Sequence, residues 1–184
     1  MGTRLFVSVD LDDLAEEVAR VQEPLRLDGL RLTDPADAHV TVKFLGDTDP
    51  DRIDALTEVL EAAAADAAVG PFEVSLEGYG VFPSLEYISV VYLGVGAGSE
   101  QLTRLHEAVE ARTTALGFDP EDHAFTPHVT LGRMDHAASK DRVQQLVREH
   151  HPDAGRTRVS ELRLTESTLT GDGPAYETVA AVPL

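Results

Sequence analysis

The chain has 184 residues, enough for one domain or two small lobes with a real core, and its lack of cysteine excludes thiol catalysis, disulfides and cysteine-ligated zinc. Its 33 acidic residues outnumber 15 lysines and arginines, and the formal net charge of −18 is unlike that of a general nucleic-acid-binding protein. The regular apolar pattern excludes a disordered acidic chain and predicts a folded body with an acidic surface.

The composition also predicts the environment in which the protein works. Lysine occurs at two positions, Lys43 and Lys140, and an acidic, lysine-poor surface is typical of proteins that stay soluble at high ionic strength. The apolar run near the N-terminus is about five residues long and acids follow it, which is unlike a signal peptide or membrane helix. We therefore expect a cytoplasmic protein without membrane contact, and a monomer because of its charge.

The first half of the chain alternates predicted strands and helices. A strand is expected over 4–10, followed by a helix over 11–27 whose apolar residues recur at spacings of 4, 3 and 4. Asp28-Gly29 and Asp34-Pro35 mark breaks around a short strand at 30–32. The strand HVTVKFLG and a helix over about 51–68 complete this half.

The second half repeats this order less regularly. Its predicted elements are strands over 72–82 and 87–95, a helix over 99–116, a strand at HVTLGR, a helix over 139–150, and strands over 158–167 and 176–184. The last two strands are expected to form a hairpin around Gly171-Asp172-Gly173. Hairpins combined with helices between strands indicate an α+β fold with antiparallel sheets.

The duplication suggests how these elements are arranged. Strand, long helix and HxT strand recur in each half, and no linker divides the chain. We expect residues 1–184 to form a single domain of two pseudo-symmetric lobes. In this bilobal arrangement, two antiparallel sheets line a central cleft and the helices lie outside.

The repeated HxT phrase carries the candidate chemistry. Residues i and i+2 of a strand share a face, so His39 lies beside Thr41, and His128 beside Thr130. Imidazole exchanges protons near neutrality, so two converging rings suit acid/base work on a phosphodiester, while hydroxyls bind its oxygens. From the residues alone, either histidine qualifies as acid or base. Arg133 is one position out of strand parity and would reach the phosphate from the end of the strand.

Other candidate sites are weaker. Residues 47–58 imitate a calcium loop, but Arg52 stands where such loops need glycine, so acids at a helix N-terminus explain the pattern better. His123, His136 and His150-His151 lack the spacing of a zinc ligand set, and His106 is expected on the flank of a helix. We predict no metal and no cofactor, since phosphate-loop and dinucleotide motifs are also missing from the sequence.

Taken together, the motifs resemble those of the two-histidine (2H) phosphoesterase superfamily, and within it the RNA 2′,3′-cyclic phosphodiesterase family, historically called 2′-5′ RNA ligase. The resemblance covers nearly the whole chain through RLFVSVDL, HVTVKFLG, GYGVFPS, HVTLGR and the closing ELRLTESTLTGDGPAYETVAAVPL. It implies metal-independent hydrolysis of a terminal 2′,3′-cyclic phosphate to a 2′-phosphate. His39 is then the proton donor, His128 the proton acceptor, and Thr41 and Thr130 bind the phosphate.

RNA as the partner requires local contacts that offset the acidic surface. Lys43 and Arg133, with Arg4 and Arg31 nearby, are expected to make the cleft locally positive. Phe82 or Tyr79 is expected to stack on the terminal base, although packing beside Pro83 explains these rings equally well.

Two alternatives to hydrolysis remain open. The first is 2′-5′ ligation, or turnover of a small cyclic nucleotide by the same residues. The second belongs to another class of protein, a non-catalytic binder of phosphate-ended RNA. A side-by-side assay of these substrates separates them.

Overall fold

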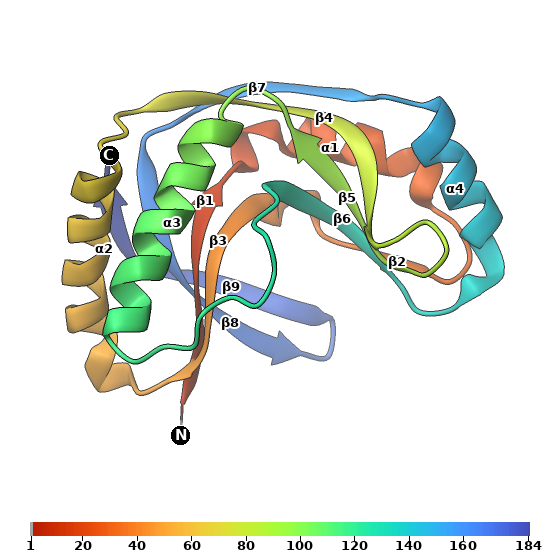
Figure 1. Ribbon diagram of the computed structural model, residues 1–184. Helices are drawn as coiled ribbons and strands as arrows, with labels where there is room; N and C mark the ends of the chain where they lie inside the picture. Colours follow the sequence, from red (N-terminus) through yellow and green to blue (C-terminus); the bar gives the residue numbers. More distant parts are fainter. Residues whose placement is uncertain (1) are drawn as a thin grey trace.

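The computed structural model describes residues 2–184. Across that range, nine strands form two antiparallel sheets, and four α-helices lie on the outside (Figure 1). The expected α+β fold with two antiparallel sheets and outer helices is confirmed. None of the helices in residues 2–184 is both long and apolar enough to cross a membrane.

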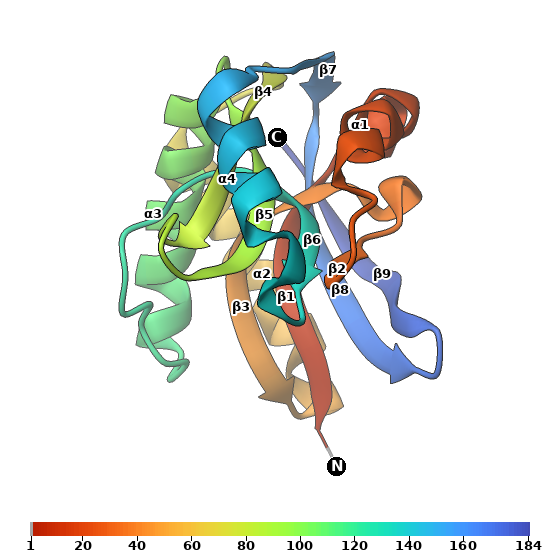
Figure 2. The same ribbon diagram turned by 90° about the vertical axis from the view of Figure 1, so that its right-hand side faces the viewer.

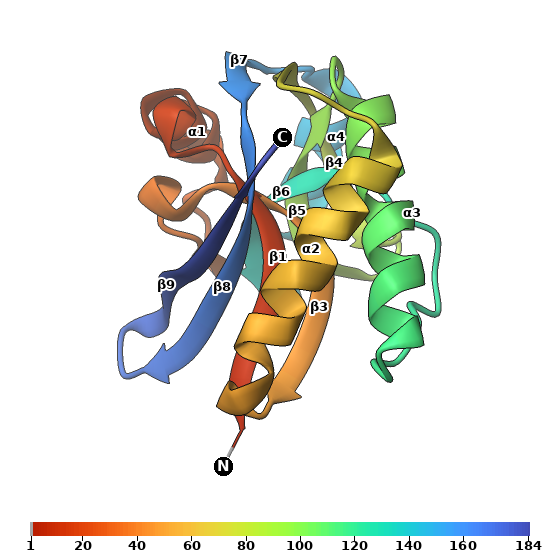
Figure 3. The same ribbon diagram turned by 90° about the vertical axis from the view of Figure 1, so that its left-hand side faces the viewer.

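The first sheet contains both ends of the described chain. Its strand order is β3 (His39–Thr48), β1 (Thr3–Asp10), β8 (Glu161–Thr170) and β9 (Gly173–Pro183). Strand β1 alternates, with Leu5, Val7 and Val9 in the core and Phe6 and Ser8 on the other face. Helix α2 (Ile53–Ala67) packs behind this sheet, and α3 (Ser99–Ala115) lies beside α2 (Figure 3).

The second sheet is built from the middle of the chain. Its order is β2 (Leu30–Leu32), β6 (His128–Met134), β5 (Ile88–Val95), β4 (Phe72–Pro83) and β7 (Asp153–Val159). Helix α4 (Lys140–Glu149) packs against β4, and α1 (Ala15–Gln22) packs against β7 (Figure 2). Strands β3 and β6, which carry the two HxT phrases, lie in contact where the two sheets meet.

The predicted helix over 11–27 is confirmed in part. Its apolar stripe, Leu14, Val18, Val21 and Leu25, is fully buried. The α-helical part is limited to α1, and single 3₁₀ turns replace it at both ends, with Pro24 in the second turn. The buried stripe therefore gave the correct inward face but overestimated the length of the helix.

The predicted strand over 158–167 is wrong as a single element. The chain leaves the second sheet at the end of β7, passes through Ser160, and enters the first sheet as β8. Because Ser160 is exposed, the strand can change direction there without burying a backbone N–H or C=O group that lacks a hydrogen-bond partner. Strand β7 was missed because Arg156 and Arg158 give it little apolar signal.

Candidate active site

Both HxT histidines are held in the same way. The Nδ1 atom of His39 lies 2.8 Å from the carbonyl oxygen of Asp37, and Nδ1 of His128 lies 2.6 Å from that of Thr126. A carbonyl oxygen can only accept, so Nδ1 carries a proton in each ring. Nε2 of each ring is left for proton exchange, and His39 Nε2 lies 3.2 Å from the hydroxyl oxygen of Thr41.

Charged groups of one sheet act on titratable side chains of the other sheet. Burial lowers the pKa of His128, the hydrogen bond to Thr126 opposes that shift, and the charges of His39 and Arg133 lower the pKa further. Arg133 also acts on Tyr176 of the first sheet, whose pKa is raised by burial and by Asp37 and lowered by the guanidinium. His39 of the first sheet and Arg133 of the second therefore both lie close enough to act on His128.

A one-residue bulge follows the threonine in each HxT strand. In β3 the register passes from Thr41 to Lys43, which leaves Val42 as the extra residue opposite β1. In β6 it passes from Thr130 to Gly132, which leaves Leu131 as the extra residue opposite β5. Each bulge reverses the facing of the residues that follow.

The bulge in β6 turns Arg133 toward the site. Arg133 pairs with Val90, and Val90 pairs with Phe82, whose ring contacts His128. Arg133 thus lies on the same face as His128, despite the odd spacing in the sequence. The expectation that it would reach in from the strand end is replaced by a direct placement on that face.

The bulge in β3 turns Lys43 away from the site, which corrects its expected contact with substrate. The Lys43 side chain is 1% exposed, and its ammonium donates to Glu110 Oε2 at 2.9 Å and to the carbonyl oxygen of Asp119 at 2.6 Å. Glu110 also accepts from the backbone N–H of Glu121. Lys43 therefore anchors the loop that leads to β6.

The remaining predicted cations are exposed. Arg4 lies on β1 beside Asp47 and Ser167. Arg31 on β2 is the register neighbour of Arg133 and forms an exposed ion pair with Asp135 at 3.2 Å.

Aromatic rings surround each histidine. Phe82 stacks on Tyr92 with ring centroids 4.4 Å apart, and both rings contact His128 at 4.9 and 5.2 Å. Phe82 thus lies beside the catalytic candidate. Tyr79 does not, because it faces the other side of the sheet and donates its hydroxyl to the Val21 carbonyl oxygen.

His106 is also placed differently from its expected helix flank. It is buried, its Nδ1 lies 2.7 Å from the Val42 carbonyl oxygen, and its ring stacks on Phe125 with centroids 4.2 Å apart. This contact supports the bulged residue of β3 from behind. His106 therefore belongs to the scaffold of the site.

A hollow of about 230 Å³ opens beside His39 on the first sheet. Its walls include Asp10, Asp37, Arg163 and Tyr176, of which Arg163 and Asp10 form an ion pair at 2.7 Å. These four residues were not predicted from the sequence. The alternation in RLFVSVD places Phe6, Ser8 and Asp10 on one face of a strand, and this pattern could have indicated Asp10. The sequence around Arg163 and Tyr176 has no pattern of comparable strength.

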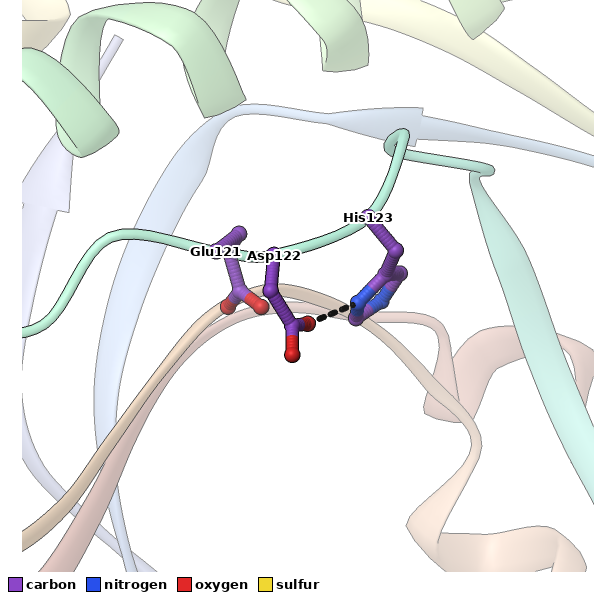
Figure 4. A group of neighbouring side chains, drawn as sticks. All are labelled: Glu121, Asp122 and His123. Carbon is purple, nitrogen blue, oxygen red and sulfur yellow. Dashed lines mark hydrogen bonds and ion pairs between the residues drawn. The ribbon is translucent and has the colours of Figure 1, made fainter.

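One cluster in the described residues has the composition of a metal site. Glu121, Asp122 and His123 follow one another in the loop between α3 and β6, with ligand atoms within 4.8 Å (Figure 4). His123 Nδ1 and Asp122 Oδ1 lie 2.9 Å apart, and this hydrogen bond raises the pKa of His123. These side chains lie in consecutive positions at the surface, so an ion pair explains the cluster. The calcium-like segment is also explained locally, since Asp49 accepts from the N–H of Asp51 at the start of a 3₁₀ turn.

The chain is similar to known proteins in its sequence and in its fold. Proteins named RNA 2′,3′-cyclic phosphodiesterase are 35% identical over 180 residues in Methanothermobacter thermautotrophicus, with 96% of each chain covered, and 31% identical over 178 residues in Methanocaldococcus jannaschii, with 96% and 98% covered. A crystal structure of a Thermus thermophilus protein matches with a TM-score of 0.81, 25% identity, and coverage of 98% of this chain and 97% of that one.

Escherichia coli LigT complexed with 3′-AMP has the same fold, with a TM-score of 0.78 at 21% identity, covering 100% of this chain and 99% of that one. The profile of the 2′-5′ RNA ligase superfamily matches residues 10–170. The chain therefore belongs to the 2′-5′ RNA ligase superfamily.

Proposed function

We propose that this protein is an RNA 2′,3′-cyclic phosphodiesterase that opens the terminal cyclic phosphate to a 2′-phosphate. The observation that carries the proposal is the matched pair of HxT histidines, each with Nδ1 tethered to a carbonyl oxygen and Nε2 available. The relatives that share that name at 31–35% identity along nearly their whole length support the same substrate.

The lowered pKa of His128 supports one assignment of the two roles. The lowered pKa of His128 favours its neutral form at neutral pH, which is the form a general base needs. His128 then accepts a proton from water as the water oxygen bonds to phosphorus. His39 is left as the acid and donates a proton to O3′ as the P–O3′ bond breaks. The products are a 2′-phosphate and a 3′-hydroxyl.

The remaining groups bind the phosphate. Thr41 and Thr130 share their strand faces with the histidines, and Arg133 lies beyond Thr130 on the same face. Hydroxyl and guanidinium donors stabilise the charge that develops on phosphorus. These side chains, together with the two imidazoles, supply proton transfer and charge stabilisation without a metal. Phe82 borders the phosphate site next to His128.

The decisive experiment uses a short RNA with a 2′,3′-cyclic phosphate in ¹⁸O-labelled water. Mass spectrometry should show one added water, with the label on a phosphate left at the 2′ position. A 3′-phosphate product would contradict the assignment of His39 to O3′. Binding without any product would favour the non-catalytic alternative. Treatment with EDTA should leave the rate unchanged, and loss of the rate would indicate a required metal.

Ligation remains a second candidate because the superfamily profile carries that name. A 5′-hydroxyl in place of water would give a 2′-5′ linkage through the same proton transfers, with His128 taking the proton of the 5′-hydroxyl and His39 donating to O3′. Adding a 5′-hydroxyl oligonucleotide to the assay distinguishes the two outcomes by product mass.

A further inference from the structure

The first sheet carries most of the exposed large apolar side chains of residues 2–184. Among residues 2–184, four large apolar side chains are strongly exposed: Phe44 at 64%, Tyr87 at 70%, Leu169 at 83% and Tyr176 at 38%. Three of them lie on β3, β8 and β9, whereas Tyr87 lies in the turn between β4 and β5. Exposed apolar groups gathered on one sheet of an acidic protein indicate a binding surface.

Aromatic contacts connect this surface to His39. The ring of Phe6 lies at the centre, with centroid distances of 5.2 Å to His39, 5.4 Å to Tyr176 and 6.0 Å to Phe44. Tyr176 in turn meets His39 edge to face at 5.4 Å. A continuous row of rings therefore extends from the proposed acid to the exposed ring of Phe44. We call Phe6, Phe44 and Tyr176 the aromatic row.

The duplicated strands give Phe44 a special position. Phe44 follows His39 by five residues, as Arg133 follows His128, and each lies beyond the one-residue bulge. Phe44 therefore occupies in the first sheet the place that Arg133 occupies in the second. One lobe presents a cation at this position and the other presents an exposed aromatic ring.

The proposed reaction determines which lobe the RNA follows. His39 donates to O3′, so the ribose that carries O3′ must lie on the side of the first sheet, while water enters from the side of His128. The hollow beside His39 gives that terminal nucleoside space. The nucleotide on its 5′ side continues outward, and the aromatic row leads in that direction.

We propose that the aromatic row binds the nucleotide preceding the cyclic end, by stacking its base on Phe44 at the exposed end of the row. This inference rests on the proposed function and specifies its substrate as single-stranded RNA of at least two nucleotides, in preference to a cyclic mononucleotide. Stacking suits this face because Asp10 and Asp37 border it and disfavour dense phosphate contacts. Arg4 lies on the same strand face as Phe6, two residues earlier on β1.

The test compares a trinucleotide that ends in a 2′,3′-cyclic phosphate with the corresponding cyclic mononucleotide. Wild-type protein should show a higher kcat/KM for the trinucleotide. Phe44→Ala should lower the ratio of the two kcat/KM values by about 5- to 150-fold, which is the usual contribution of one stacked base. Phe44→Trp should preserve the ratio, and the matched control Tyr87→Ala should leave it unchanged.

A binding measurement separates this inference from the proposed function. Fluorescence anisotropy with a labelled trinucleotide that ends in a 2′-phosphate should show the same order of variants without any turnover. If turnover occurs but Phe44→Ala leaves the ratio unchanged, the stacking site is wrong and the enzyme assignment stands. If no substrate is turned over, the enzyme assignment fails. Weaker trinucleotide binding by Phe44→Ala would then still support the site, and unchanged or undetectable binding would overturn it.

Discussion

The two catalytic candidates have the same local geometry but different surroundings. Each Nδ1 is tethered to the carbonyl oxygen two residues earlier, which fixes the tautomer and the orientation of both rings. His128 additionally has Arg133 close by, while the hollow beside His39 contains Asp10 and Asp37. The pKa of His128 is lowered first by burial and then by neighbouring charges, and a repeated motif cannot reveal either effect.

Removal of either imidazole should abolish most of the activity. His39→Ala and His128→Ala should each lower kcat by about 10²- to 10⁴-fold, because each deletes one proton transfer in the transition state. Steady-state assays on a cyclic-phosphate trinucleotide measure the loss, and circular dichroism checks the fold. His150→Ala is a suitable control, since this histidine is exposed and is absent from the groups that act on His128. A rate within threefold of wild type for either variant would contradict the two-histidine mechanism.

If His128 is the base, its lowered pKa should set the acidic limit of activity. A base with a lowered pKa stays neutral to lower pH, so kcat/KM should fall only as the pH drops through a midpoint below 6.5. Arg133→Gln removes one of the charges that lower this pKa, so the midpoint should move up toward 6.5. The pH profile of kcat/KM and an NMR titration of the His128 ring both measure this shift.

Arg31→Gln is the matched control for this change of charge, because Arg31 is paired with Asp135 and is absent from the groups that act on His128. Its acidic midpoint should equal that of the wild type.

The lowered pKa of His128 also affects the stability of the fold. The unfolded chain binds the His128 proton more readily than the folded one, so this contribution to stability is full above pH 6.5 and declines as the pH falls toward the folded pKa.

At the scale of elements, the sequence predicted which strands carry the site but not which way every side chain faces. The period-two pattern correctly paired His39 with Thr41 and His128 with Thr130. It failed at Lys43 and Arg133, because a single bulged residue reverses strand parity and leaves no compositional signal. The crossing at Ser160 was missed for a similar reason, since a change of sheet within one continuous strand pattern depends on tertiary pairing.

The buried Lys43 gives the site a structural support that can be tested. Burial raises the pKa of Glu110, but its hydrogen bonds to the Lys43 ammonium and to the N–H of Glu121 outweigh that effect and lower it overall. Lys43→Met should remove the partner of this carboxylate and destabilise the protein by about 2–4 kcal/mol, since breaking a buried pair leaves one charge uncompensated. Urea unfolding measures the change in free energy.

A double variant separates the lost pair from lost packing. Lys43→Met with Glu110→Gln removes both charges, so it should recover part of the stability lost in the single variant. Equal losses in the single and double variants would show that the pair contributes little. Because Lys43 also holds the Asp119 carbonyl oxygen, the single variant should loosen the loop before β6, and hydrogen exchange over 117–127 should report that change.

At the scale of the whole molecule, the duplication was the most informative sequence feature. Two copies of one phrase, 89 residues apart, predicted two similar lobes, and the structure places the copies on neighbouring strands of two different sheets. We infer that the two sheets act as one catalytic unit, because each supplies one histidine and one threonine. The hollow beside His39 was beyond prediction, since β1, β8 and β9 meet there from opposite ends of the chain.

The acidic surface should give this protein an unusual response to salt. With a net charge of −18, the protein repels RNA, and its own acidic side chains repel one another. Raising the ionic strength from about 0.1 to 1 M shortens the screening length from about 10 to 3 Å. Proteins that bind nucleic acids through many cations lose affinity over such a range. Here salt should weaken the repulsion between the acidic protein and RNA more than it weakens the few attractive contacts between cations and phosphates. The KM for a cyclic-phosphate trinucleotide should therefore stay level or fall. The thermal midpoint should rise over the same KCl series. A KM that increases steeply with salt would mean that cations, and not stacked rings, carry most of the binding.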